Sequence, residues 1–114
     1  MKRLIIGAGF ALFVSPALAC SCIPVTAATP KPEILLSAEV RAVASVNDGR
    51  ESVATLRVAT RFIGQTPKTI RVTTRTSSAA CGVSFAKGKR QLFALQRAGN
   101  SYTTDLCLMQ QARL

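Results

Sequence analysis

The sequence contains no histidine and no tryptophan, and its 15 lysine and arginine residues stand against only five aspartate and glutamate residues. Without histidine, the Ser-His and Cys-His nucleophile pairs found in many hydrolases cannot form. The acids are scattered along the chain, and none belongs to a recognisable metal-binding loop: Glu33, Glu39, Asp48, Glu51 and Asp105. We therefore expect no enzymatic activity, no cofactor and no metal ion of its own.

Aromatic side chains are also scarce, with five phenylalanines and one tyrosine, Tyr102. Proteins that bind single-stranded nucleic acid stack successive bases on exposed aromatic rings. With so few rings, the positive charge of this chain does not indicate a nucleic-acid partner. Such charge instead favours contact with other anions, such as lipid headgroups or polysaccharides.

The start of the chain has the composition of an export signal. Lys2 and Arg3 precede an uncharged apolar run over residues 4–14, and Ala17-Leu18-Ala19 then forms an A-x-A pattern. This order predicts a signal peptide over residues 1–19 that is removed before Cys20. The apolar run is shorter than the ~20 residues that span a bilayer, so we expect no transmembrane segment after cleavage.

Cleavage before Cys20 would leave residues 20–114 as one exported domain, either periplasmic or secreted. This part keeps 13 basic residues and all five acids, so its net charge is 13 − 5 = +8. A lipoprotein signal is the alternative, and lipidation would acylate the amino group of Cys20. Lipoprotein signals usually carry leucine three places before that cysteine, whereas Ala17 in this chain favours ordinary cleavage.

Four cysteines remain in the exported part: Cys20, Cys22, Cys81 and Cys107. Small exported domains commonly supplement a limited core with disulfides, so we expect all four to be oxidised. A Cys20–Cys22 bridge would close a strained ring, which leaves each of these two paired with Cys81 or Cys107. A four-cysteine zinc site is the alternative, but Cys81 and Cys107 are too far apart to form its second C-x2–4-C pair. A redox function would require a C-x-x-C pair, which is absent.

Much of the exported chain alternates between apolar and polar residues with a period of two, which is typical of β-strands. In the clearest case, Ala54, Leu56, Val58, Thr60 and Phe62 would share the buried face, with Arg57 and Arg61 on the outer face. Asn47-Asp48-Gly49 predicts a hairpin turn. We predict five strands, over residues 39–46, 52–63, 69–76, 90–96 and 102–108.

A short helix is expected before the strands. Pro32 and Glu33 have the composition of a helix start, and Ile34, Leu35 and Leu36 would pack it on the core. Five strands, short turns and one short helix predict an all-β protein, a small five-stranded barrel of the OB-fold-like Greek-key type with two disulfides. A β-sandwich is the alternative, but it usually needs about seven strands.

Four separate stretches of the chain match one kind of module. The exported part begins Cys20-Ser21-Cys22-Ile23-Pro24, and Phe62-Ile63-Gly64 supplies an aromatic-x-Gly after a long strand. Residues 78–88 provide a cysteine loop, and residues 102–107 a closing strand. Together they resemble the netrin-like module, in particular the N-terminal domain of tissue inhibitors of metalloproteinases, over nearly all of residues 20–114. The third disulfide and the second cysteine-rich domain of the animal inhibitors are missing.

The resemblance implies an OB-fold barrel with the disulfides Cys20–Cys81 and Cys22–Cys107. It also implies a mechanism, because the N-terminal cysteine of those inhibitors presents its free α-amine and carbonyl oxygen to the catalytic zinc of a metalloproteinase. Cys20 would take this role here, and Ser21 would enter the specificity pocket of the protease. A zinc metalloendopeptidase is therefore an expected partner. Netrin-like modules also occur in proteins that inhibit nothing, so the fold follows more directly than the activity.

A second expected function depends on charge alone. Four arginines are predicted on outward strand faces, and three further basic residues share one loop: Arg57, Arg61, Arg71, Arg75, Lys87, Lys89 and Arg90. These residues would bind anionic envelope components, either polysaccharide or lipid, without protease inhibition. A solvated basic surface that only aids solubility would have the same pattern.

Overall fold

Strands are the main regular elements of the structure, a computed structural model that describes residues 20–113. The predicted signal peptide at residues 1–19 lies outside the described residues. The strands follow one another as β2 (Ile34–Val46), β3 (Glu51–Ile63), β4 (Thr69–Arg75), β5 (Arg90–Ala98) and β6 (Ser101–Thr103). Three short helical segments complete the fold: η3 (Ser78–Ala80), α1 (Leu106–Met109) and η4 (Gln110–Arg113).

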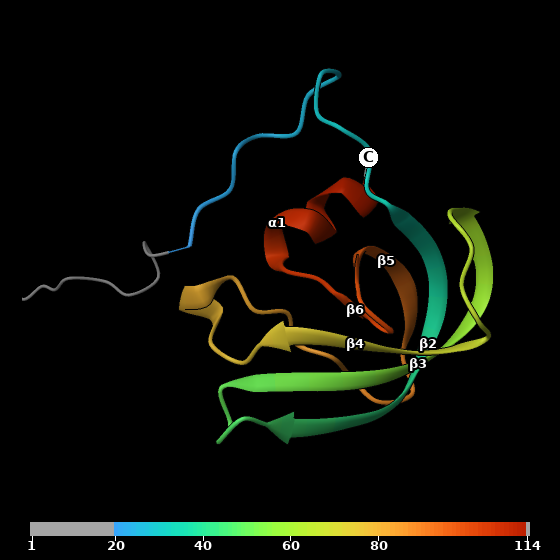
Figure 1. The fold of residues 1–114 in the computed structure, drawn as a ribbon. Helices are drawn as coiled ribbons and strands as arrows, with labels where there is room; N and C mark the ends of the chain where they lie inside the picture. The colour runs from blue at the N-terminus through green and yellow to red at the C-terminus, as the bar shows by residue number, and fades with distance from the viewer. Residues whose placement is uncertain (1–19, 114) are drawn as a thin grey trace, which may run out of the picture.

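The strands close into a barrel in the order β2-β3-β4-β6-β5 (Figure 1). β4 and β6 run parallel, whereas the other four neighbouring pairs are antiparallel. In the OB-fold Greek-key arrangement, the third and fifth strands along the chain pair in parallel, and here these strands are β4 and β6. The predicted all-β, five-stranded barrel with two disulfides is therefore confirmed, and it has one short α-helix, α1, which lies at another place than expected.

The barrel interior is filled by apolar side chains from alternate strand positions. Each of the largest is less than 2% exposed: Phe93, Ile34, Leu36, Leu56, Leu95, Val40 and Val72. Burying one such side chain contributes roughly 1.5–3 kcal/mol. A second, smaller cluster lies outside the barrel wall, where Leu108 and Ala112 of the C-terminal helices pack on Ala94 and Leu35.

The helix expected over residues 32–36 is wrong, because β2 already begins at Ile34. Ile34 and Leu36 face the barrel interior, while Leu35, on the opposite face, packs under the C-terminal helices. Three successive apolar residues thus serve two separate clusters on the two faces of one strand. Cross-strand packing therefore overrides the local preference for a helix start.

The closing strand is also shorter than predicted. β6 ends at Thr103, and Cys107 lies in α1 instead of in a strand. Asp105 begins the helix, because its carboxylate accepts a hydrogen bond from the backbone N–H of Leu108 at 2.7 Å. An aspartate before an apolar run is a helix N-cap pattern, so the sequence did contain the relevant indication.

Strand β3 does not keep one face buried along its whole length. Its register against β2 shifts at Ala59 and again at Phe62, and each shift is a β-bulge. The buried row predicted for this strand therefore ends at Val58, and both Thr60 and Phe62 are exposed, Phe62 by 58%. A third shift, at Arg41 in β2, lies where the β2–β3 hairpin extends past the barrel.

The hairpin turn at Asn47-Asp48-Gly49 is confirmed. All three residues have positive φ, and the N–H of Gly49 donates to the carbonyl oxygen of Val46 at 3.1 Å. Asn, Asp and Gly tolerate the left-handed region better than other residues, so this triplet fixes the position of the turn.

Two phenylalanines offer a test of the core. Phe93 is fully buried and Phe62 is 58% exposed. We expect Phe93→Ala to lower the free energy of unfolding by about 3–5 kcal/mol, because it removes a large side chain and leaves a cavity. Phe62→Ala, the matched control, should lower it by less than about 1 kcal/mol. Urea denaturation of both variants measures the difference, and equal losses would contradict this assignment of the core.

Candidate functional site

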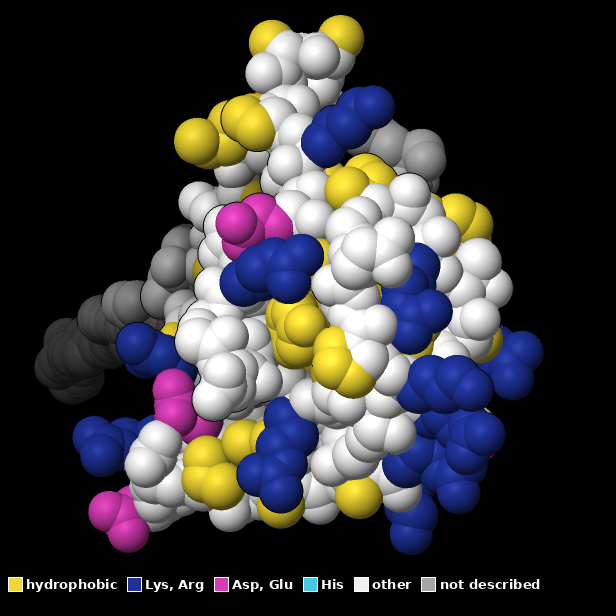
Figure 2. Space-filling model, turned by 45° about the vertical axis from the view of Figure 1, so that its right-hand side comes forward, with side chains coloured by type: hydrophobic (Ala, Val, Ile, Leu, Met, Phe, Trp, Pro, Cys, Tyr) yellow, Lys and Arg dark blue, Asp and Glu magenta, His cyan; other side chains and the backbone are white. Residues whose placement is uncertain are grey.

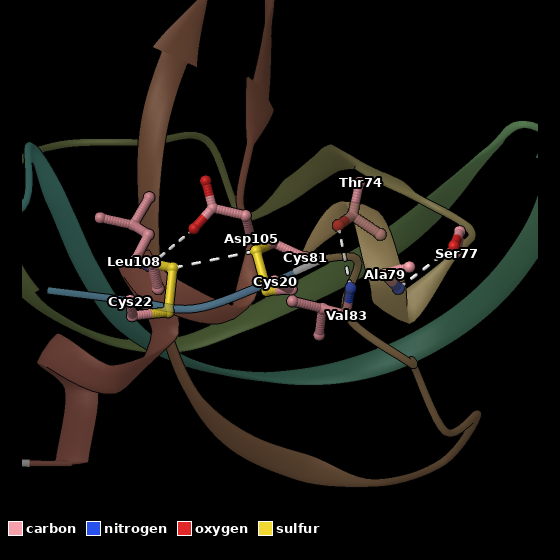
Figure 3. The surroundings of a disulfide bond; sticks show 10 residues. Cys20, Cys22, Thr74, Ser77, Ala79, Cys81, Val83, Asp105 and Leu108 are labelled. Atoms are coloured by element: carbon pink, nitrogen blue, oxygen red, sulfur yellow. Dashed lines mark hydrogen bonds between the residues drawn. A yellow bond between two sulfur atoms is a disulfide. The ribbon is translucent and has the colours of Figure 1, made fainter. Parts of the chain in front are cut away.

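Cys81 is one of the two cysteines that were expected to pair with Cys20 and Cys22. It lies in a tight turn after the end of β4. Ser77 caps the short helix η3 by accepting a hydrogen bond from the N–H of Ala79 at 3.2 Å (Figure 3). The N–H of Cys81 donates to the carbonyl oxygen of Ser78 at 3.0 Å, and Cys81 itself is left-handed, with φ 63°. This turn fixes the direction of the Cys81 side chain.

The residue after Cys81 must be glycine. A Cβ atom on Gly82 would lie 1.9 Å from the carbonyl oxygen of Arg75, which is far inside van der Waals contact. The loop therefore crosses directly over the end of β4. Beyond this crossing, the N–H of Val83 donates to the buried hydroxyl oxygen of Thr74 at 3.0 Å, which ties the loop to β4.

Cys107, the other cysteine that was expected to pair with Cys20 or Cys22, lies in the first turn of α1. The N–H of Leu106 donates to the carbonyl oxygen of Cys81 at 2.8 Å, so the two cysteine-bearing segments are directly hydrogen-bonded. The buried hydroxyl of Thr104 donates to the carbonyl oxygen of Ala94 at 2.8 Å and holds the start of this segment on β5. Turn and helix thus lie side by side at one end of the barrel.

Two disulfides join the N-terminal segment to this end of the barrel. Cys20 is bonded to Cys81 and Cys22 to Cys107, with Cα–Cα distances of 5.3 and 5.2 Å. This pairing agrees with the one that the resemblance implies. No free cysteine remains among the described residues. Two disulfides are consistent with an exported protein, because they persist in oxidising compartments.

The two disulfides touch each other. The sulfur atoms of Cys81 and Cys107 lie 4.0 Å apart, and the sulfur of Cys20 lies within 4.8 Å of both (Figure 3). Because all these sulfurs are in disulfides, none carries a proton and the contact is one of van der Waals type. The alternative of a zinc site would need the same sulfurs as thiolates. Oxidation thus removes them as metal ligands.

Between its two anchors the N-terminal segment is exposed. Ser21, between the two bonded cysteines, is exposed, and Ile23, just beyond them, is 89% exposed. Among residues 20–113, no hydrogen bond joins residues 20–32 to the barrel. A cleft of about 510 Å³ opens beside the segment, with Ile23, Pro24 and Pro30 on one side and Leu108 and Gln111 on the other. Among the described residues, and apart from the peptide chain itself, the two disulfides are therefore the only covalent or hydrogen bonds that tie residues 20–32 to the barrel.

The seven basic residues selected from the sequence are all exposed, but they do not form one patch. In the β5–β2–β3 register Arg90 lies opposite Glu39, which lies opposite Arg57. Arg41 forms an ion pair with Glu39 at 3.6 Å, and Arg71 is on the neighbouring strand β4. These arginines share the outer face of the barrel wall, and Figure 2 shows one face of the molecule with far more basic than acidic side chains.

Two of the predicted residues depart from this arrangement. Arg61 is paired with buried Leu36, because the bulge at Ala59 reverses the face on which it lies. Its Nε atom donates to the carbonyl oxygen of Thr66 at 2.9 Å and so stabilises the β3–β4 turn. The prediction that Arg57 and Arg61 share one face is therefore wrong. Arg75 lies opposite Glu51 near the hairpin turn.

Lys87 and Lys89 precede β5 in an exposed loop, as expected. Arg41, in contrast, was not selected from the sequence, although it is exposed and paired with Glu39. A strict period of two would place Arg41 on the same face as Glu39, so the sequence did contain a signal for this residue. The bulge at Arg41, in contrast, has no signal in the small residues around it.

No protein-family model matches the chain, and no curated protein matches it either. The resemblance to the netrin-like module therefore stays a prediction. Within residues 20–113, no helix has the length and apolar character needed to cross a membrane.

Removing the disulfides should separate their role from that of the core. Each bridge closes a long loop, with sequence separations of 61 and 85 residues. We expect the paired variants Cys20→Ser/Cys81→Ser and Cys22→Ser/Cys107→Ser each to lower the free energy of unfolding by about 4 kcal/mol. Urea denaturation measures this loss, and non-reducing peptide mapping of the wild type checks the pairing. A loss below about 1 kcal/mol, or a Cys20–Cys22 peptide, would contradict the proposed tethering.

Proposed function

We propose that residues 20–114, after cleavage before Cys20, inhibit zinc metalloendopeptidases by binding the catalytic zinc ion of the protease. The observation that supports this most directly is the geometry of Cys20-Ser21-Cys22. Both cysteines are bonded to the barrel, and Ser21 between them is exposed. An extended segment that is fixed at both ends and exposed in the middle can enter an active-site cleft without refolding.

The zinc ligands would come from the backbone of Cys20. Its free α-amine and its carbonyl oxygen are separated by two carbon atoms, so together they close a five-membered chelate ring on a metal ion. A catalytic zinc keeps one coordination position open for water. Chelation by the amine and the carbonyl oxygen would displace this water, which such proteases use as their nucleophile.

The disulfides would contribute to affinity by preorganisation. The entropy that is lost when a flexible segment becomes ordered normally opposes association. Here Cys20 and Cys22 are already held at Cα–Cα distances of 5.3 and 5.2 Å from their partners. Ser21 would point into the specificity pocket of the protease, so the size of its side chain would set which proteases are inhibited. The resemblance to tissue inhibitors of metalloproteinases supports the same roles for Cys20 and Ser21.

A one-residue extension tests the chelation directly. Adding one alanine before Cys20 moves the free amine by ~3.8 Å, one Cα step. Because zinc–nitrogen bonds of ~2.0–2.1 Å tolerate little displacement, we expect the extended protein to lose inhibition. Acetylating the Cys20 amine should have the same effect, because an amide nitrogen is a poor zinc ligand. The measurement is residual activity in a panel of zinc endopeptidases incubated with each form.

The matched control is an alanine added after Leu114, which leaves the N-terminus free and should inhibit like the wild type. Ser21→Leu should change the ranking of the proteases while leaving the disulfides intact. If the wild type inhibits no protease in the panel, or if the extended form inhibits equally well, the mechanism is wrong.

A second candidate function is the binding of anionic polysaccharide or lipid surfaces by the outer wall of the barrel. The observation that favours it is the register row in which Arg90 and Arg57 flank Glu39, with Arg41 beside it. One acid among several exposed arginines leaves a surplus of positive charge on a continuous sheet. Such a surface attracts polyanions by simple electrostatics.

Charge reversal tests this candidate. We expect Arg57→Glu and Arg90→Glu, which lie in the row, each to weaken binding to heparin or to anionic vesicles more than the single reversal Arg61→Glu, which lies off the row. Binding should also weaken steeply with added salt, because exposed charges are screened beyond ~8 Å at physiological ionic strength. Retention on a heparin column and vesicle sedimentation measure both effects. Binding that is independent of salt would argue for a basic surface that only aids solubility.

A further inference from the structure

The contact between the two disulfides joins sulfur atoms that belong to different bonds. Sγ of Cys81 lies 4.0 Å from Sγ of Cys107, and the dashed line between the two yellow bonds in Figure 3 marks this contact. The bonded partners of these two cysteines, Cys20 and Cys22, both lie on the N-terminal segment. A thiolate formed on Cys81 or on Cys107 would therefore lie beside a disulfide that is still intact, which is the arrangement needed for thiol–disulfide exchange.

The barrel holds one sulfur of each disulfide independently of the N-terminal segment. The N–H of Leu106 donates to the carbonyl oxygen of Cys81 at 2.8 Å, and Asp105 caps the helix that carries Cys107. Neither hydrogen bond involves residues 20–32, and among the described residues none ties that segment to the barrel. Loss of the disulfides would therefore leave Cys81 and Cys107 in place, while the segment would be free to move away.

All four cysteines are only half-buried, so a small thiol can reach their sulfurs. The exposed residue Ser21 lies between the two cysteines of the segment, which leaves this side of both disulfides open to solvent. The two sulfurs in contact come from positions 26 residues apart in the sequence. They form no C-x-x-C motif, and only the fold brings them together.

We propose that a dithiol reductant releases both anchors of the N-terminal segment in a single two-electron reduction, through exchange between the two disulfides. A thiolate of the reductant attacks Sγ of Cys20, which forms a mixed disulfide and expels Cys81 as a thiolate. The Cys81 thiolate then attacks Sγ of Cys107, which forms a Cys81–Cys107 bond and expels Cys22 as a thiolate. The second thiol of the reductant finally attacks its own sulfur in the mixed disulfide and frees Cys20.

The reductant leaves as a cyclic disulfide, and its two protons end on the thiols of Cys20 and Cys22. Attack on Cys22 first gives the same product, because the expelled Cys107 thiolate then attacks Cys81 and frees Cys20. Exchange in this direction is favoured because the released segment regains conformational freedom and has no hydrogen bond to the barrel to lose. The two freed cysteines do not bond to each other, because that ring is strained. The Cys81–Cys107 bond is therefore the end point.

This exchange would regulate the inhibitor. Without exchange, a reductant would have to break each disulfide separately to free the segment. With exchange, one reduction ends the preorganisation of Cys20 and Ser21, while the barrel keeps one disulfide. This consequence rests on the inhibitory function proposed above, whereas the exchange itself does not.

Partial reduction of the wild type tests the exchange. The protein is incubated at neutral pH with one molar equivalent of dithiothreitol until equilibrium, alkylated, and mapped by mass spectrometry. We expect molecules with two alkyl groups to carry them on Cys20 and Cys22, and to yield a Cys81–Cys107 peptide. Two alkyl groups on the members of one native pair would show reduction without exchange and would overturn the proposal. So would a mixture that contains only unlabelled and fourfold-labelled molecules.

Single-cysteine variants test the same exchange without a reductant. Cys20→Ser leaves Cys81 unpaired beside the Cys22–Cys107 bond, so we expect the free thiol to appear on Cys22. Cys22→Ser is the matched mirror variant, and its free thiol should appear on Cys20. Both variants should therefore contain the Cys81–Cys107 bond. A free thiol that stays on Cys81 in the first variant and on Cys107 in the second contradicts the exchange.

The double variant Cys20→Ser/Cys22→Ser asks whether the barrel allows this bond. We expect Cys81 and Cys107 to be oxidised to each other while the strand amides keep their protection from hydrogen exchange. Two thiols that resist oxidation in the folded double variant would show that these sulfurs cannot close, and the proposal would be wrong.

Protease assays separate the exchange from the inhibitor proposal. The exchanged, alkylated wild type is freed of dithiothreitol before the assay, because thiols bind zinc themselves. If the untreated wild type inhibits no protease, the inhibitor proposal fails while the peptide map still decides the exchange. If the untreated and exchanged forms inhibit equally well, the exchange does not regulate inhibition and that consequence is wrong.

Discussion

The parallel pairing of β4 with β6 is the constraint on which the candidate site depends. Val72 lies opposite Tyr102 and Thr73 opposite Thr103, and the N–H of Thr104 donates to the carbonyl oxygen of Thr73 at 3.1 Å. Because parallel strands end at the same edge of a sheet, the segments that follow them must emerge together. Cys81 follows β4 and Cys107 follows β6, so both arrive at the same end of the barrel. One short strand pair therefore brings together two cysteines that lie far apart in the sequence.

The class of the fold could be predicted because its evidence is local. The period of two over residues 52–58 and the triplet Asn47-Asp48-Gly49 each report on neighbouring residues, and the structure agrees with both. The exclusion of a Cys20–Cys22 bridge is also local, since it follows from the size of the ring. Whether Cys20 and Cys22 each pair with Cys81 or with Cys107 cannot be decided from local evidence. That choice depends on how turn η3 and helix α1 are oriented at the barrel end, and only the resemblance provided it.

The errors at Leu35, Phe62 and Arg61 share a physical cause, which is pairing and packing with other parts of the chain. In the sequence, Leu35 is one of three similar apolar residues. Its contacts with Leu108 and Ala112 form only when the C-terminal helices are in place. Phe62 reads as a core residue, yet the two bulges in β3 turn it toward solvent. Bulges have weak sequence patterns, so the faces of a long strand become uncertain beyond the first one. Arg61 was misplaced for the same reason.

The long loops closed by the two disulfides also bear on how the chain must be made. Synthesis proceeds from the N-terminus, so Cys20 and Cys22 emerge together long before their partners, which follow 61 and 85 residues later. Until then each has only the other as a nearby thiol. Native pairing thus requires either that oxidation waits for β6 to join β4, or that an early bond is exchanged afterwards through a thiolate. The sulfurs of Cys81 and Cys107 lie only 4.0 Å apart, so the choice of partner is ambiguous a second time when the final disulfides form. Where an early bond does form, the rate at which this protein matures should therefore depend on thiol–disulfide exchange as well as on the folding of its barrel.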